Sequence, residues 1–254
     1  MANGRVAGSS KGYSFRMCRI NATTKKPTPL SLGFDLWSVT TICKGVRMDP
    51  FPRAAAWGWG LAAKGMASHL GVDVEEAKSI LKNANATPWQ QSQVDATRGM
   101  RVHKFLQDLC DGKKPKPKDD YEKGVEKAFR EVLEPTGIVG SEIPLFHLQD
   151  MYAGTTDIII GDPSTGVTVV DLKTHEPMLK RQAAYLEDQL QVEAYGQAVE
   201  WMYGWPVSRL AVLVCPSNGQ YVYETFPYGM HGKLWQYTLR AYQEEHGQVN
   251  MIGV

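Results

Sequence analysis

The chain has 254 residues, of which 43% are hydrophobic and 22% charged, so its composition is that of an ordinary globular protein with enough apolar side chains for a core. The formal net charge of +1 excludes a strongly basic surface overall, and any affinity for nucleic acid must therefore come from a local patch. No segment approaches the roughly 20 apolar residues that span a bilayer, and the polar N-terminus lacks a signal sequence, which predicts a cytoplasmic protein, or one of the host cytoplasm if it is phage-encoded.

The first half of the chain is predicted to consist of an arm followed by helices. Residues 1–35 are rich in Gly, Ser, Thr, Lys and Pro, which predicts a flexible N-terminal arm with one short strand at 13–20. Residues 36–135 are expected to form a mostly helical part, because apolar residues recur at helical spacing along most of it. The expected helices lie at 38–70, 74–83, 88–110 and 121–133.

The segment Lys113–Lys118 is basic and contains two prolines, so it is predicted to be an exposed loop. Two interpretations of this loop stay open at this point. It is either a solvated linker or, together with Lys25 and Lys26, a set of contacts to the phosphate backbone of DNA.

Residues 136–250 are predicted to contain a β-sheet. The expected strands lie at 141–147, 152–161, 167–173, 210–215 and 221–226, and the expected helices at 179–203 and 232–246. The turn Asp162–Gly166 joins the second and third strands. This order predicts an α/β (α+β) fold in which a central mixed β-sheet of about five strands is flanked by helices, and in which the helical first half joins the sheet in one compact unit.

Two other patterns limit the function. The four cysteines are Cys18, Cys43, Cys110 and Cys215, and none forms a C-x-x-C pair, so they are predicted to be reduced and mostly buried thiols rather than zinc ligands or a disulfide framework. The sequence has no G-x-x-x-x-G-K-[ST] loop, so it does not encode an ATP-driven motor of that type.

An acid and a lysine end the third predicted strand. Asp171 and Lys173 are two residues apart, so their side chains share one face of the strand at a separation of about 7 Å along the chain. A carboxylate binds a hard divalent cation, and a neighbouring ammonium can orient a water molecule or offset the charge that builds on a phosphate. The pair therefore points to phosphate chemistry, although a D-x-K triplet by itself usually marks an ordinary strand edge.

A second acid, Asp157, precedes three isoleucines in the neighbouring strand. Pairing of the two strands through the turn Asp162–Gly166 brings Asp157 and Asp171 toward the same end of the sheet. Two converging carboxylates repel each other unless a cation lies between them. We therefore predict a site for Mg²⁺ or Mn²⁺.

Five elements occur in a recurrent order between residues 98 and 195. They are a histidine in the helix 88–110, a glutamate in the first strand, G-x-x-D, D-x-K, and Q-x-x-x-Y in the following helix. In this chain they correspond to His103, Glu142, Gly154 to Asp157, Asp171 to Lys173, and Gln191 to Tyr195. This order resembles the PD-(D/E)XK nuclease superfamily and its RecB-like exonucleases. Residues 38–42 and the Trp-rich sequence after them are similar to the mitochondrial-genome-maintenance exonuclease branch and its phage relatives.

The resemblance implies a restriction-endonuclease-like core at 136–250, to which the helix 88–110 contributes His103. It implies an exonuclease that hydrolyses phosphodiester bonds from the ends of single-stranded DNA, in phage or bacterial replication, recombination or repair, alongside a replication or recombination protein. The metal would be held by His103, Asp157, Asp171 and the Leu172 carbonyl. The catalytic residues would be Glu142, Asp157, Asp171, Lys173, Gln191 and Tyr195.

The chain departs from this pattern in two places, and alternatives stay open. Met100 replaces the usual threonine after the glycine of the histidine motif. Only Cys215 lies late enough to match the iron–sulfur cysteines of some relatives, so we predict no iron–sulfur cluster. His103 alone could be a core histidine, Glu142 a plain edge carboxylate, and Gln191 the polar edge of an amphipathic helix. The alternative functions are a structure-specific endonuclease of the same superfamily and a non-catalytic DNA-binding or recombination module.

Overall fold

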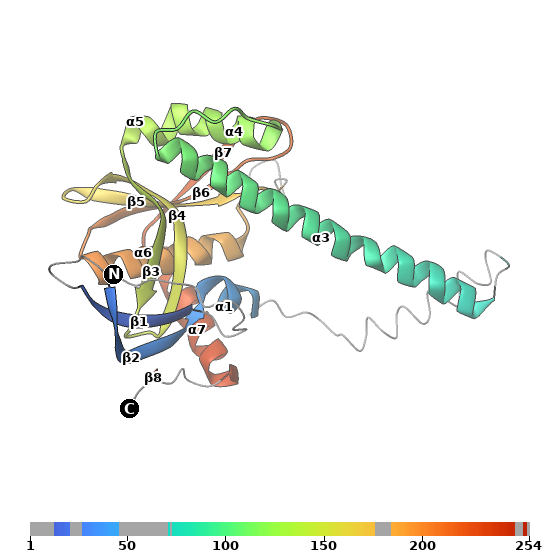
Figure 1. Ribbon diagram of the computed structural model, residues 1–254, viewed down its shortest axis with the longest axis horizontal. Helices are drawn as coiled ribbons and strands as arrows, with labels where there is room; N and C mark the ends of the chain where they lie inside the picture. The colour runs from blue at the N-terminus through green and yellow to red at the C-terminus, as the bar shows by residue number, and fades with distance from the viewer. Residues whose placement is uncertain are drawn as a thin grey trace. The chain divides into compact units, whose positions relative to one another are not determined.

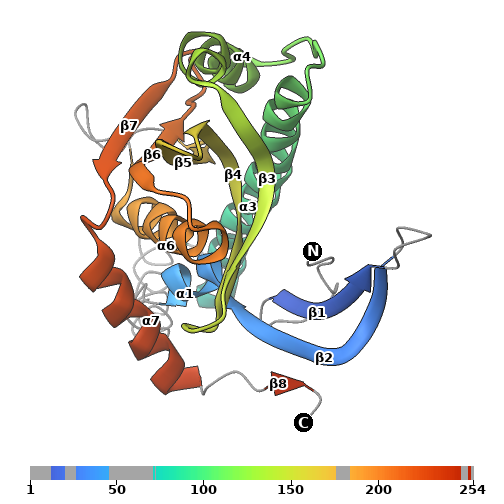
Figure 2. The same ribbon diagram turned by 90° about the vertical axis from the view of Figure 1, so that its left-hand side faces the viewer.

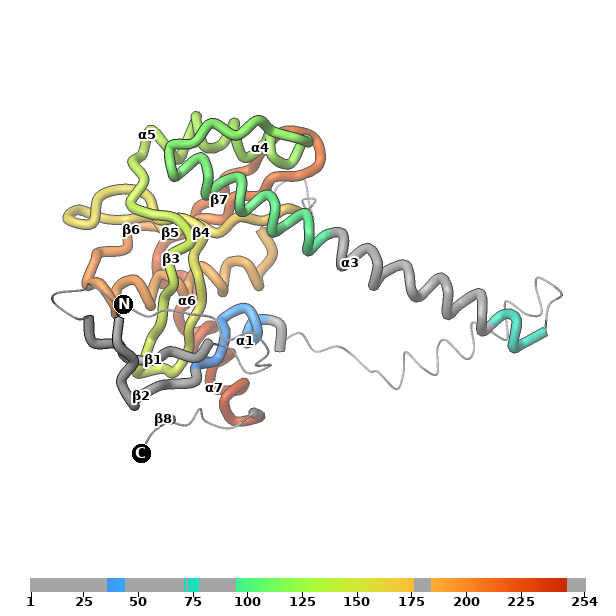
Figure 3. Tube along the Cα trace, in the orientation of Figure 1, coloured from blue at the N-terminus to red at the C-terminus, as the bar shows by residue number. Residues whose placement is uncertain are grey.

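The structure is a computed structural model that describes the backbone of residues 13–20, 27–45, 71, 73–175, 184–246 and 251–252 (Figure 1). Side chains are described for residues 36–43, 71, 73–77, 95–175 and 184–245 (Figure 3). The chain divides into two compact units, one formed by Met1–Val46 with Val102–Val254 and the other by Arg47–Arg101. This division follows neither expected boundary, at 35 or at 135. Every residue of the candidate site lies in the first unit.

Two strands lie in the region expected to be a flexible arm. β1 (Tyr13–Ile20) pairs antiparallel with β2 (Pro27–Ser38), and β2 also pairs with the short β8 (Met251–Ile252). β1 is the short strand predicted at 13–20, whereas β2 was not predicted. Its prolines obscured the alternation of Leu30, Leu32 and Phe34, which is the period of a strand.

The helical region differs from the prediction at two points. Helix α1 spans only Val39–Gly45 of the expected helix 38–70, and residues 46–70 lie outside the described residues. Helix α3 (Val74–Cys110) is continuous where two helices were expected. The interruption predicted before Pro88 was wrong, because a proline removes a single helical hydrogen bond and the segments on both sides are long enough to stay helical.

The predicted central mixed sheet is confirmed, and its five expected strands belong to a sheet of eight strands in the described part of the chain (Figure 1). Its strands are β3 (Ile138–His147), β4 (Tyr152–Asp162), β5 (Gly166–Lys173), β6 (Val207–Val214) and β7 (Val222–Pro227). Each strand pairs with the next, antiparallel except for the parallel pair β5–β6, so the sheet is mixed. β2 extends it by a short parallel pairing with the beginning of β4.

Helices complete the α+β fold. α4 (Asp120–Ala128) continues through a π-helical turn (Phe129–Leu133) into α5 (Glu134–Thr136). α6 (Leu186–Tyr203) and α7 (Gly232–His246) follow later in the chain. α6 begins after the predicted position 179, because Tyr185 still has extended backbone; residues 179–183 lie outside the described residues.

Each face of the sheet has its own hydrophobic core (Figure 2). Because side chains alternate along a strand, Ile159 and Val169 face one core while Ile158 and Val170 face the other. The first core includes residues of α1, α6 and α7, among them Ile42, Leu190 and Trp235. The second includes residues of α3, α4 and the π-helical turn, among them Leu106, Val125 and Leu133. The C-terminal part of α3 is thereby packed on the sheet opposite α6.

Two further observations concern the chain as a whole. Of the helices that the structure describes, none combines the length and the apolar character needed to cross a bilayer. Cys43, Cys110 and Cys215 are free thiols, and Cys43 and Cys215 are buried, as predicted. Burial raises the pKa of both buried thiols to about 12, so each stays in its unreactive neutral form.

Candidate active site

Asp157 and Asp171 are brought together by the pairing of β4 with β5. Ile158 pairs with Val170, and each acid lies one residue beyond this pair on its own strand. Both carboxylates are almost fully buried, with 7% of Asp157 and 2% of Asp171 exposed. The Asp157 Oδ2 atom accepts a 2.6 Å hydrogen bond from the backbone N–H of Leu172, which fixes its position beside β5. The strand register therefore produces the convergence that the sequence predicts.

A histidine from α3 and a glutamate from β3 meet Asp157. His103 Nδ1 lies 2.8 Å from Asp157 Oδ1 and 3.8 Å from Glu142 Oε1. One potential ligand atom from each of these three residues lies within 4.8 Å of the other two. We call His103, Glu142 and Asp157 the histidine group. Three side chains at this spacing, from three different elements, are able to hold a metal ion.

Glu142 has an unusual backbone conformation inside its strand. Its φ is 50°, in the left-handed region that side chains other than glycine seldom adopt. Ser141 pairs with Ile158 and Ile143 pairs with Thr156, so Glu142 lies opposite Asp157 in the register. Backbone strain of this kind is concentrated at functional sites, where it aims a side chain that a regular strand would direct elsewhere.

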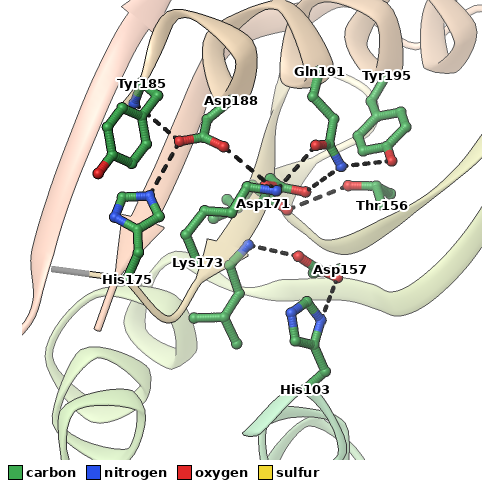
Figure 4. Close-up of polar contacts among 12 residues, drawn as sticks. His103, Thr156, Asp157, Asp171, Lys173, His175, Tyr185, Asp188, Gln191 and Tyr195 are labelled. Carbon is green, nitrogen blue, oxygen red and sulfur yellow. Dashed lines mark hydrogen bonds and ion pairs between the residues drawn. The ribbon is translucent and has the colours of Figure 1, made fainter. Parts of the chain in front are cut away.

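A second group of side chains surrounds the ammonium of Lys173 (Figure 4). Its Nζ lies 2.7 Å from Asp171 Oδ2 and donates a 3.0 Å hydrogen bond to Gln191 Oε1 on α6. The amide of Gln191 in turn donates to Asp171 Oδ1 at 3.0 Å and to the Tyr195 hydroxyl at 2.9 Å. Asp188 Oδ1 lies 3.7 Å from the same ammonium. We call Asp171, Lys173, Asp188 and Gln191 the lysine group.

The Q-x-x-x-Y and G-x-x-D elements are in direct contact. Gly154 packs against the ring of Tyr195 so closely that a Cβ at position 154 would overlap the ring. Tyr195 is 2% exposed and its hydroxyl accepts the hydrogen bond from Gln191. Glycine is needed at 154 because only its bare backbone leaves room for the tyrosine that supports Gln191. Gln191 and Tyr195 thus support the lysine group from a buried side of α6, which is not the solvated polar edge that was the alternative.

The charges in the histidine group stabilise each other. Burial opposes protonation of His103, but the carboxylate of Asp157 outweighs it and raises the histidine pKa to about 10, with a smaller contribution from Glu142. Burial acts to raise the pKa of Asp157, yet His103 and the Leu172 N–H together hold it below the ordinary value. In the metal-free protein the pair is therefore an imidazolium beside a carboxylate.

Asp171 is in a different electrostatic environment. Burial, together with the neighbouring charge of Asp157, raises the pKa of its carboxyl to about 7 against the attraction of Lys173. The pKa of Lys173 lies above its usual value because Asp171 and Asp188 outweigh the effect of burial. Lys173 is therefore a permanent cation, whereas Asp171 is poised between its two protonation states.

The carboxylate of Asp171 has one cation of the chain beside it. Its Oδ2 atom is fully buried, and the Lys173 ammonium lies 2.7 Å away. The neighbouring Asp157 carboxylate repels it, and this repulsion contributes to the raised pKa of Asp171. A divalent cation held between Asp157 and Asp171 would remove their repulsion, so the residues present fit Mg²⁺ or Mn²⁺.

The structure gathers the predicted side chains of the site into these two neighbouring groups, with Tyr195 in contact with Gln191 of the lysine group. Leu172 was predicted to hold the metal through its carbonyl. In the metal-free structure its backbone N–H donates a hydrogen bond to Asp157. Asp188 was not among the predicted residues. The available signal was weak: Asp188 accepts a hydrogen bond from the backbone of Tyr185, a helix-start contact that many acids make. His175, which contacts Asp188 at 3.2 Å, was also missed.

The basic loop is exposed, as predicted. Lys113 forms ion pairs with Asp108 at 2.7 Å and with Asp111 at 3.1 Å, so its charge is neutralised within the chain. Lys114 and Lys116 are exposed. The phosphate-contact interpretation therefore concerns Lys114 and Lys116 more than Lys113. Lys25 and Lys26 lie outside the described residues.

Comparison with known proteins adds little. No family model and no curated protein matches the chain. A solved structure described as "Crystal structure of SSO0001" is similar over 60% of this chain and 87% of its own length, with 11% sequence identity and a TM-score of 0.31. A likeness this low supports no inference about function.

Proposed function

We propose that this protein is a metal-dependent deoxyribonuclease of the PD-(D/E)XK type, an exonuclease that hydrolyses phosphodiester bonds from the ends of single-stranded DNA. The observation that carries the proposal is the meeting of two buried carboxylates, Asp157 and Asp171, with a permanently charged lysine at one end of a mixed sheet. The order of motifs in the sequence supports the same conclusion. We place the activity in the cytoplasm, in phage or bacterial DNA replication, recombination or repair.

The residues that would hold Mg²⁺ or Mn²⁺ are His103, Asp157, Asp171 and the carbonyl of Leu172, with Glu142 beside them. When bound, the ion supplies Lewis-acid chemistry: it polarises the phosphate and lowers the pKa of an attacking water. His103 must lose its proton to act as a ligand. The Asp157 carboxylate, which stabilises the imidazolium in the metal-free protein, would then stabilise the cation instead.

The lysine performs the role that needs a fixed positive charge. Lys173 is 22% exposed at its side chain, and its ammonium is held by protein atoms. Asp171 and Gln191 orient it. An ammonium fixed in this way can orient the attacking water and offset the negative charge that develops on the phosphate, without reorganising during the reaction.

The test uses the full chain with four DNA substrates: end-labelled linear single strands, end-labelled linear duplexes, and covalently closed circles of each. We expect digestion of linear single-stranded DNA with Mg²⁺ or Mn²⁺ and none with chelator. Cleavage of the circles would identify an endonuclease instead. Binding of DNA without cleavage would identify a DNA-binding or recombination module, and absence of both would overturn the proposal.

The residue-level control compares two lysines. Lys173→Ala is expected to reduce hydrolysis by about 1000-fold, the upper end of the loss seen when a group that stabilises a transition state is removed, while DNA binding is largely kept. Lys123→Ala removes an exposed lysine of α4 that pairs only with Asp120 in the described structure, and should leave hydrolysis unchanged. Undiminished cleavage by Lys173→Ala would rule out the mechanism.

A further inference from the structure

We infer that Asp188 is a positioning residue, which holds the Lys173 ammonium in its place, and that His175 fixes Asp188 in turn. Neither residue belongs to the motifs that led to the proposed function. The consequence for hydrolysis rests on that proposed function, whereas the placement of the ammonium does not.

The two oxygens of Asp188 have different partners (Figure 4). Oδ2 accepts a 2.9 Å hydrogen bond from the backbone N–H of Tyr185 and lies 3.2 Å from His175 Nε2. Two contacts on one oxygen fix the orientation of the carboxylate, and they leave Oδ1 as the atom nearest Lys173, at 3.7 Å. Asp188 is 7% exposed, so water screens this attraction only weakly.

His175 is itself held in place. Its ring packs against the ring of Tyr185, with the two centroids 4.4 Å apart. Tyr185 thus contacts both members of the pair, through its backbone N–H to Asp188 and through its ring to His175. The arrangement links His175, two residues beyond the end of β5, to the first turn of α6, on the side of Lys173 opposite Gln191 in Figure 4.

The contacts explain what Lys173 gains from this additional acid. Its ammonium lies 2.7 Å from Asp171 Oδ2 and 3.7 Å from Asp188 Oδ1, and it donates a hydrogen bond to Gln191 Oε1. Asp188 is fixed by Tyr185 and His175, so it adds a second carboxylate that is anchored independently of β5. Partners on both β5 and α6 confine the ammonium more closely than Asp171 alone would.

A purely structural role for Asp188 must be separated from positioning, because its carboxylate also caps the start of α6. Asp188→Asn keeps an oxygen that can accept from Tyr185 and removes the charge. Asp119→Asn is the matched control, since the Asp119 side chain accepts a 3.0 Å hydrogen bond from Glu122 N at the start of α4. If capping a helix were the only role of Asp188, the two substitutions would have the same effect on the Lys173 ammonium.

The first measurement is independent of nuclease activity. In the metal-free protein, the ammonium of Lys173 is observed by ¹H–¹⁵N NMR and assigned by its loss in Lys173→Arg. We expect Asp188→Asn to accelerate exchange of the ammonium protons by about tenfold, since one charged partner is lost. His175→Gln should accelerate it less, and Asp119→Asn should not change it. An identical Lys173 signal in Asp188→Asn would overturn the inference.

The second measurement is steady-state hydrolysis of linear single-stranded DNA. We expect Asp188→Asn to lower kcat by about 10- to 100-fold with KM nearly unchanged, the loss expected from a misplaced reacting group. A normal kcat in Asp188→Asn, with Lys173→Ala inactive, would overturn the positioning role. If the wild-type protein cleaves no DNA, the proposed function fails, and the ammonium signal alone decides this inference.

Discussion

The two halves of the candidate site differ in how completely they satisfy their own charges. The histidine group draws one residue from each of α3, β3 and β4, and two of its three side chains are open to solvent, with 32% of His103 and 35% of Glu142 exposed. The lysine group comes only from β5 and α6, and its ammonium is surrounded by Asp171, Gln191 and Asp188. The first group holds a proton in the metal-free protein, whereas the second places its own ammonium beside two carboxylates, of which Asp171 is also a proposed metal ligand.

This difference suggests a division of roles between binding and positioning. An open cluster of two acids and a histidine changes its state when a cation arrives, because the imidazolium must release its proton. A buried network whose members hold one another keeps its geometry during that change. Asp157 connects the two halves, since it contacts His103 with one oxygen and the backbone of Leu172, next to Lys173, with the other.

The largest expected effect tests metal binding by the histidine group. Asp157→Asn should weaken Mn²⁺ binding, measured by isothermal titration calorimetry, by more than about 100-fold, because loss of a ligand exceeds the 10- to 100-fold loss typical of outer-shell changes. Asp162→Asn is the matched control at the C-terminal end of β4, where the carboxylate is exposed and contacts Ser164. Equal Mn²⁺ affinity in the two variants would show that the binding half is assigned to the wrong residues.

The next effect separates the halves. Gln191→Ala should lower kcat for DNA hydrolysis by about 10- to 100-fold and Mn²⁺ affinity by less, because Gln191 orients Lys173 as well as the proposed ligand Asp171. Gln197→Ala is the control on the same helix, since Gln197 contacts Glu193 and Gln236 instead. If Gln191→Ala lost as much Mn²⁺ affinity as kcat, the histidine group and the lysine group would not have separate roles.

Much of the fold was predictable because its signals are local. The isoleucines after Asp157, the turn Asp162–Gly166 and the apolar run before Asp171 define β4 and β5 and their register. β2 escaped prediction because prolines precede its alternating residues. The continuity of α3 escaped prediction because the helical segments on both sides of Pro88 outweigh the loss of one helical hydrogen bond at the proline.

The site was predictable for those residues that belong to the recurrent order of motifs. Asp188 lacked such a signal, because its partners Lys173 and His175 are distant in sequence and are brought near only when α6 packs on β5. The positive φ of Glu142 was also invisible, since glutamate has no preference for that conformation. Properties that depend on tertiary packing or on backbone strain are not encoded in a short pattern.

A smaller effect should appear in the pH dependence of metal-free stability. The pKa of His103 is about 10 in the folded protein and about 6.5 in an unfolded chain. The His103–Asp157 contribution is thus complete below pH 6.5 and declines as pH rises toward 10. Because His103 is partly exposed, we expect a loss of about 1–2 kcal/mol between pH 6.5 and 9.5, by urea denaturation with chelator. His103→Gln should lack this component, and parallel profiles for the two proteins would contradict it.

The smallest effect concerns the strain that aims Glu142 at the binding half. Glu142→Gly and Glu142→Ala both remove the carboxylate, but only glycine adopts a φ of 50° without strain, so the glycine variant should be more stable by about 1 kcal/mol. At Ser141, the neighbouring residue of β3, whose φ is not positive, the order should reverse and alanine should be the more stable. The four free energies of unfolding, measured by urea denaturation with chelator, isolate the backbone effect from the loss of charge. If the alanine variant is more stable than the glycine variant at both positions, the backbone of Glu142 is not strained. Placing Glu142 in the histidine group then costs the protein no stability.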